Sequence, residues 1–179
     1  MTDPAAVDML EALRAELGIA APGELVECPG VAGPMMTGLL RPTILLPAGG
    51  VDGETLWFIL RHELTHFRRR DIGYKLLLLC AALVHWFNPL VWAAFFLSGK
   101  DMEMSCDEAV VHALGEQIRA DYSTSLLRLA TGRRRIAGMP LAFGEGDTKS
   151  RIRNLVNWKT PKRWAALLAA VVCIAVAGA

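Results

Sequence analysis

The feature that most constrains this chain is an almost wholly apolar run from Gly73 to Leu97, GYKLLLLCAALVHWFNPLVWAAFFL. Asn88-Pro89 interrupts the run and is a favourable helix start, because asparagine caps helices and proline suits the first turn. The run therefore predicts two apolar helices, at about residues 72–87 and 89–114. Such helices either dip into or border a membrane, or pack as buried core helices, and the pattern leaves both open.

Capping residues and hydrophobic spacing predict helices on either side of this run. Asp3 and Asp52 are the expected N-caps of the first two, since a short acidic side chain can accept the free backbone N–H groups of a helix start. Helices are predicted at about residues 4–18, 52–70, 117–131 and 149–158. The expected fold is mainly α.

A small β element is expected before the helix over 52–70. The run LLRPTILL, residues 39–46, has strand-like composition and contains Pro42, which removes one backbone donor. Proline favours an edge strand, and proteases often bind extended substrate as an added strand at a sheet edge. An ordinary core strand is the alternative. The residues of the expected substrate edge are Leu40, Arg41, Thr43, Ile44 and Leu45.

The segment HELTH, residues 62–66, lies in the middle of the predicted helix over 52–70. Residues four apart share a helix face, so the imidazoles of His62 and His66 can reach one ion. Catalytic zinc takes three protein ligands plus water, and Glu63 can accept a proton from that water as general base. The motif predicts a zinc-dependent peptidase with one Zn²⁺ per chain. A surface helix with two incidental histidines is the alternative.

A third zinc ligand is expected from an acidic segment of the helix over 89–114. Glu103 and Asp107 are four residues apart and share a face. We expect Glu103 to bind the zinc and Asp107 to hold a ligand imidazole by its other nitrogen. Asp107 as the ligand with Glu103 in support, or a solvated acidic stretch, are the alternatives.

The cysteines are expected to be buried, reduced thiols. There are four of them, and none stands in CxxC spacing. This argues against both a disulfide framework and a cysteine zinc knuckle.

Five segments make the chain resemble a known family. They are PMMTGLLRPTILLP (34–47), LRHELTHFRRRD (60–71), HWFNPLVW (85–92), DMEMSCDEAV (101–110) and LAFGE (141–145). Their order and spacing resemble the BlaR/MecR family of bacterial antirepressor metallopeptidases, which are integral membrane zinc proteins. That family is similar in its core to prenyl-protein endopeptidases and HtpX-like membrane proteases. These pair HExxH with a later ExxxD, which Glu103 and Asp107 match.

The resemblance implies a membrane-associated zincin domain at the cell membrane, with the zinc site on the cytoplasmic side. We expect a metallopeptidase domain over 1–131, a loop over 132–148, and a basic helix with a C-terminal membrane segment over 149–179. The uncharged part of the membrane segment, residues 164–179, is shorter than the ~20 residues that span a bilayer, which favours a truncated segment. LAFGE resembles the stretch where the family cuts itself, so self-cleavage is expected near Ala142 and Phe143; a passive linker is the alternative.

The function expected is that of a regulatory, antirepressor-type membrane metalloendopeptidase. It would hydrolyse peptide bonds in a cytoplasmic regulator, such as a transcriptional repressor, in itself, or in both. A hydrophobic content of 53% favours the lipid bilayer as a partner, and a net charge of +1 gives no reason to expect direct nucleic-acid binding. A housekeeping membrane-protein quality-control protease, or a non-proteolytic receptor or scaffold with structural zinc, are the alternatives.

Overall fold

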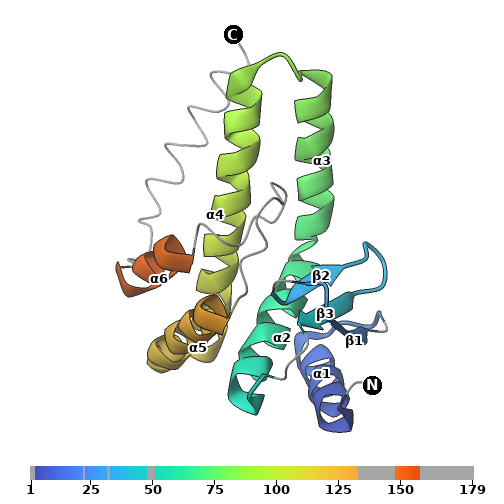
Figure 1. The fold of residues 1–179 in the computed structure, drawn as a ribbon, viewed down its shortest axis with the longest axis vertical. Helices are drawn as coiled ribbons and strands as arrows, with labels where there is room; N and C mark the ends of the chain where they lie inside the picture. Colours follow the sequence, from blue (N-terminus) through green and yellow to red (C-terminus); the bar gives the residue numbers. More distant parts are fainter. Residues whose placement is uncertain (1–2, 22, 32, 48–50, 133–147, 158–179) are drawn as a thin grey trace.

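A computed structural model of the chain describes residues 3–21, 23–31, 33–47, 51–132 and 148–157. A lower body carries a long helical hairpin that rises from it (Figure 1). The expected cleavage residues Ala142 and Phe143 and the apolar segment over 164–179 lie outside the described residues. The elements are α1 (Pro4–Leu17), β1 (Glu24–Cys28), β2 (Met35–Thr37), β3 (Thr43–Pro47), α2 (Gly53–Arg69), α3 (Asp71–Val84), α4 (Pro89–Leu114), a 3₁₀ turn η1 (Glu116–Ile118), α5 (Arg119–Gly132) and α6 (Thr148–Asn157).

The predicted helix starts are confirmed by their caps. The Asp3 side chain accepts from a backbone N–H of α1, Asp52 from the Thr55 N–H at 3.0 Å, and Asn88 from the Leu90 N–H at 3.0 Å. Each bond satisfies a donor that the first turn of a helix leaves free. The prediction of a mainly α fold with a small β element is therefore confirmed.

The prediction that LLRPTILL forms an edge strand is wrong. The sheet order is β1-β3-β2, so β3 lies in the centre, parallel to β1 and antiparallel to β2. Pro42 precedes the strand, where its missing N–H is not needed, and its carbonyl accepts the Glu24 N–H at 3.0 Å. The expected substrate edge has no unpaired backbone in β3, because Thr43, Ile44 and Leu45 are paired on both sides; Leu40 and Arg41 lie in the exposed bend before it.

Two hydrophobic cores meet on α2. One joins α1, the sheet and α2, and the other joins α2 to α4, α5 and α6. Leu60 and Leu64 of α2 have 0% exposure, and burying each such side chain stabilises the fold by about 1.5–3 kcal/mol. Phe58, on the same helix, belongs to the second core and contacts the Tyr122 ring edge-on. The helix that carries HELTH is therefore held from both sides.

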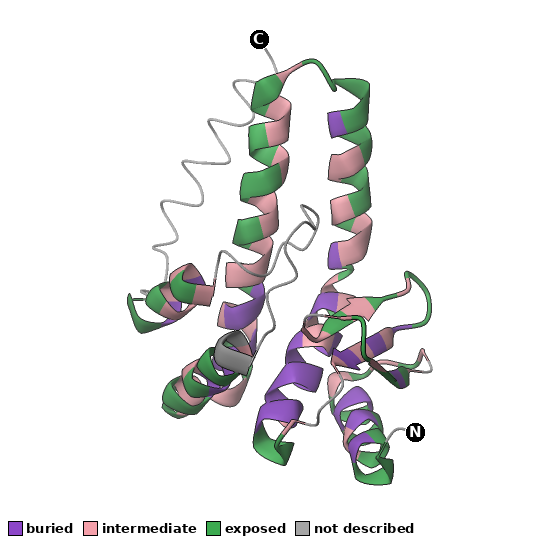
Figure 2. Ribbon diagram, viewed as in Figure 1, coloured by how far each residue is buried: buried purple, intermediate pink, exposed green. Residues whose placement is uncertain are grey.

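The outer part of the α3–α4 hairpin is not a buried core, so that alternative is wrong. Every residue from Leu83 to Phe87 is exposed, and Figure 2 shows mainly exposed and half-buried residues along both helices above the body, although Ala82 is buried. The fully apolar side chains at the tip include Leu83, Phe87 and Leu90, which is 76% exposed. Among the helices within the described residues, none combines the length and the hydropathy needed to cross a bilayer.

The expectation for the cysteines holds only in part. Cys106 is buried, Cys28 is half-buried and Cys80, on the hairpin, is exposed; these three are free thiols. Cys173 lies outside the described residues.

Candidate metal centre

The two histidines of HELTH and one glutamate of α4 converge on a single point. His62 and His66 are 7% and 6% exposed, and their Nε2 atoms lie 3.0 Å apart. Glu103 Oε2 lies 3.5 Å from the first of these atoms and 3.6 Å from the second. Tetrahedral zinc with bonds of about 2.0–2.2 Å has ligand atoms about 3.3–3.6 Å apart. The two distances to Glu103 match this spacing, and the two imidazoles need to separate by only about 0.3 Å for all three side chains to hold a zinc ion. They are the three that the sequence predicts as ligands.

Glu63 stands beside the first of these histidines on α2 and is half-buried. Its side chain therefore keeps access to solvent while the flanking histidines are enclosed.

His62 is held from behind by a buried relay. Its Nδ1 lies 2.8 Å from the Tyr122 hydroxyl, which donates to Asp107 Oδ1 at 2.7 Å; Nδ1 itself is 3.3 Å from that oxygen. With Nδ1 engaged in this way, Nε2 is left to face the metal position. Asp107 thus occupies the supporting place that the sequence predicts for it.

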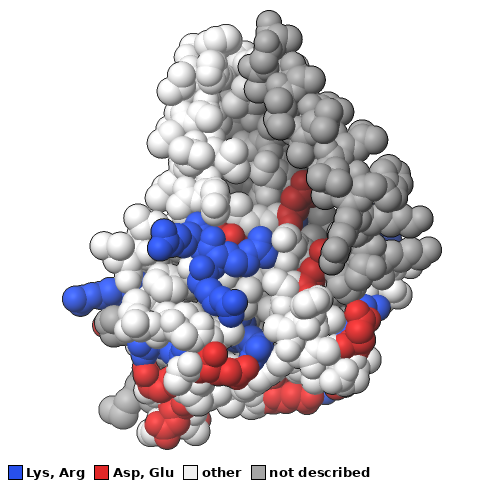
Figure 3. Space-filling model, turned by 180° about the vertical axis from the view of Figure 1, so that it is seen from behind, with Lys and Arg blue, Asp and Glu red and all other residues white. Residues whose placement is uncertain are grey.

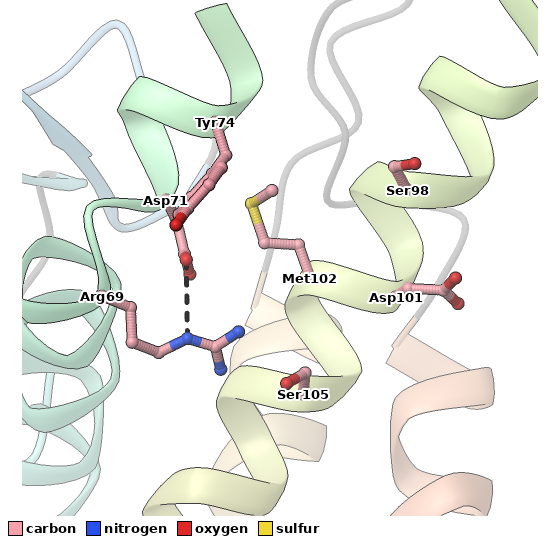
Figure 4. A pocket seen from close by; sticks show the side chains of 7 residues that line it. All are labelled: Arg69, Asp71, Tyr74, Ser98, Asp101, Met102 and Ser105. Carbon is pink, nitrogen blue, oxygen red and sulfur yellow. Dashed lines mark ion pairs between the residues drawn. The ribbon is translucent and has the colours of Figure 1, made fainter. Parts of the chain in front are cut away.

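His66 is held by Asp71, whose Oδ2 lies 2.6 Å from its Nδ1. The break between α2 and α3 makes this contact, because Arg70 adopts a left-handed conformation (φ 59°) that ends one helix and begins the next. Asp71 also pairs with Arg69 at 3.4 Å, as Figure 4 shows.

A cavity of about 430 Å³ opens beside this break. Asp71 and Tyr74 line it from α3, and Met102 and Ser105 line it from α4 (Figure 4). Asp71 therefore lies between the cavity and His66, so a molecule in the cavity would contact the support of a ligand and not the ligand itself.

Arg151 reaches the centre from α6. Its Nε and Nη2 donate to the two oxygens of Asp107 at 2.7 and 2.6 Å. Its Nη2 is also 3.4 Å from His62 Nε2, and its Nη1 is 3.6 Å from Glu103 Oε2. The guanidinium therefore ties α6 to the two acidic groups of α4 through a two-pronged, charge-assisted contact.

Cys106 completes the ring of potential ligands. It lies one turn after Glu103 on α4 and has 0% exposure. Ligand atoms of His62, His66 and Cys106 all lie within 4.8 Å of one another. The Cys106 thiol donates to the His62 backbone carbonyl at 3.6 Å.

The charges of the centre are strongly coupled. Burial opposes charge on His66, yet hydrogen bonds, first among them that with Asp71, raise the pKa of its imidazole to about 10. Burial also opposes charge on Asp107, but the hydrogen bonds from Arg151 and His62 lower the pKa of its carboxyl to about 2. The metal-free imidazole of His66 thus holds a proton that a metal ion has to displace.

Four side chains at this centre were not predicted as site residues. Asp71 has a local signal, since it is the first acidic residue after His66 and falls where the helix breaks. Tyr122 and Arg151 have none, because each lies in a separate helix, far along the chain from HELTH. Cys106 has no signal of its own either, because zinc-binding cysteines usually come in pairs and this one is single.

Comparisons with known proteins match most of the chain. The family described as BlaR1 peptidase M56 matches residues 1–155. The regulatory protein BlaR1 of Bacillus licheniformis is 32% identical over 143 residues, which cover 76% of this chain and 24% of that protein. The methicillin resistance mecR1 proteins of Staphylococcus aureus (strain Mu50) and Staphylococcus epidermidis are 25% identical over 150 residues, covering 78% of this chain and 26% of theirs. The chain spans about a quarter of the length of these curated relatives.

Proposed function

The chain belongs to the BlaR1 peptidase M56 family, and from this premise we propose that it is a zinc-dependent metalloendopeptidase of regulatory type. The observation that carries the proposal is the convergence of His62, His66 and Glu103 at distances of 3.0–3.6 Å. The names of the relatives, a regulatory protein and a methicillin resistance protein, support a regulatory role.

The residues of the centre divide the work of peptide hydrolysis. His62, His66 and Glu103 would hold Zn²⁺, which when bound polarises the scissile carbonyl and lowers the pKa of a water molecule to about 7. Glu63 takes a proton from the attacking water and passes it to the leaving amine. Asp107, through Tyr122, keeps the His62 ring oriented with Nε2 inward.

The substrate proposed is a cytoplasmic protein, either a transcriptional repressor or the chain itself, and no direct contact with nucleic acid is part of the proposal. Such a protein has to offer the enzyme a segment of extended backbone, because proteases often bind their substrate as an added strand. Glu63 favours this function over a receptor with structural zinc, since a metal held only for stability needs no base beside it.

Replacing Glu103 with alanine is expected to weaken zinc binding, so that less than one zinc per chain is retained, because the ion loses its carboxylate ligand. Zinc per chain, measured by elemental analysis after gel filtration, checks this. Glu108→Ala is the matched control, since Glu108 lies on the same helix and accepts from Asn154 at 2.9 Å instead. Full zinc in Glu103→Ala together with loss in Asp107→Ala would assign the ligand role to Asp107.

The proposed place of the enzyme is the cytoplasmic side of the cell membrane, with the α3–α4 hairpin in the bilayer. The hairpin exposes large apolar side chains at its tip, including Trp86 at 71% and Phe87 at 69%. Basic side chains gather below this uncharged part in Figure 3, and in sequence Arg68, Arg69 and Arg70 stand directly before α3. A helix of 14 residues is about 21 Å long, shorter than the ~30 Å of bilayer hydrocarbon. The hairpin would therefore enter the bilayer without crossing it. The basic side chains at its lower end would then lie at the lipid headgroups.

A polarity-sensitive fluorophore on Cys80 is expected to shift its emission to the blue when vesicles containing phosphatidylglycerol are added, because this exposed thiol lies on the hairpin. Cys28 and Cys173 are replaced by serine so that labelling is confined to Cys80. The control carries the fluorophore on Val7→Cys of α1, in a chain with Cys80→Ser. Flotation of the vesicles shows whether the protein binds them. If the protein binds and the emission of the Cys80 fluorophore does not shift, the proposal is contradicted.

A further inference from the structure

The Cys106 thiol is placed like a ligand and is used by nothing in the proposed reaction. It follows Glu103 by three residues on α4, so both side chains face the same pair of imidazoles. It is fully buried, within 4.8 Å of the histidine ligand atoms. Its hydrogen bond to the His62 carbonyl at 3.6 Å is weak because a thiol is a poor donor, and the thiol also interacts with the imidazoles of His62 and His66.

The two imidazoles of α2 are therefore approached by two donors from α4: the Cys106 thiol, which lies within 4.8 Å of their ligand atoms, and the Glu103 carboxylate, which lies 3.5 and 3.6 Å from their Nε2 atoms. Zinc readily takes a thiolate at about 2.3 Å. The number of protein ligands decides what the ion can do, because catalytic zinc keeps a fourth position open whereas four protein ligands close it. A centre with both Glu103 and Cys106 bound would be closed.

We propose that Cys106 is the fourth zinc ligand of the resting chain and that its sulfur closes the site. The inference rests on the proposed zinc site and adds a second state to it. As the zinc–sulfur bond forms, the thiol gives its proton to solvent and a water molecule leaves the fourth position. When the sulfur withdraws, it takes up a proton, can donate again to the His62 carbonyl, and water returns. The chemistry of α4 thus holds the enzyme inactive without a separate inhibitor.

The zinc-loaded full chain tests this by X-ray absorption at the zinc edge. One sulfur at about 2.3 Å is expected in the wild type, and none in Cys106→Ser. After cobalt substitution, a thiolate-to-cobalt charge-transfer band in the near ultraviolet is expected in the wild type. The band should be lost in Cys106→Ser and kept in Cys80→Ser, the matched control with an exposed cysteine. Cys106→Ser should also hydrolyse peptide faster per bound zinc, because its fourth position stays open.

Failure of the proposed function and failure of the role of Cys106 give different results. A wild-type chain that binds no zinc by elemental analysis would remove the proposed function itself. A wild-type chain that binds zinc with only nitrogen and oxygen neighbours would overturn the role of Cys106 and leave the peptidase proposal standing, and this measurement does not depend on whether a variant folds. An equal or lower rate per zinc in Cys106→Ser would overturn the resting state.

Discussion

Replacing Glu63 with alanine is expected to reduce peptide hydrolysis by about 10²–10⁴-fold, the usual contribution of a general base. Zinc binding is expected to persist, because the ligand atoms that converge belong to His62, His66 and Glu103. The measurement is kcat/KM on a peptide substrate together with zinc per chain, so that loss of the base is separated from loss of the metal.

Two further variants sharpen the Glu63 experiment. Glu63→Gln keeps the shape of the side chain and removes its basicity, so it should be as inactive as the alanine variant. Glu54→Ala removes an exposed carboxylate from the first turn of the same helix and should leave the rate unchanged. Wild-type turnover in Glu63→Ala would remove Glu63 from the mechanism.

The elements that the sequence predicts well are those whose signals are local. Asp3, Asp52 and Asn88 mark helix starts because each bonds an N–H within three residues. The i, i+4 spacing of His62 and His66 likewise fixes a shared face once α2 forms. For the same reason, the spacing of Glu103 and Asp107 puts both on one face of α4, although it does not fix their distance from α2.

What the sequence leaves open depends on long-range packing. The position of β3 is decided by which strands pair with it, and Pro42 misleads because it lies just before the strand and not within it. Arg151 is 89 residues from His62, and nothing in its own helix distinguishes it from Lys149 or Arg153. Only the docking of α6 on α4 selects it.

Removing the Asp107 carboxylate is expected to destabilise the fold by about 3–5 kcal/mol, the cost of leaving a buried charge without its partner. Arg151 is 8% exposed, and two of its nitrogens donate to Asp107 at 2.6 and 2.7 Å. In Asp107→Leu this guanidinium would lose both short hydrogen bonds and keep only Glu103, 3.6 Å from its Nη1, as a charged partner. The contact of α6 with α4 would be weakened accordingly. Urea unfolding of the chelator-treated chain measures the effect, because the loss of metal then contributes nothing.

The double variant Asp107→Leu with Arg151→Met tests whether the unpaired guanidinium causes the destabilisation of Asp107→Leu. Both variants deprive the Tyr122 hydroxyl of its acceptor, so the difference between them isolates the buried guanidinium. Replacing a whole buried pair by apolar side chains is often neutral, so the double variant should recover most of the lost free energy of unfolding. Glu108→Leu, which breaks only the neighbouring bond from Asn154, should cost about 1 kcal/mol. Equal destabilisation of the single and double Asp107 variants would mean that the carboxylate acts through His62 and Tyr122, and that the pair with Arg151 does not hold α6 in place.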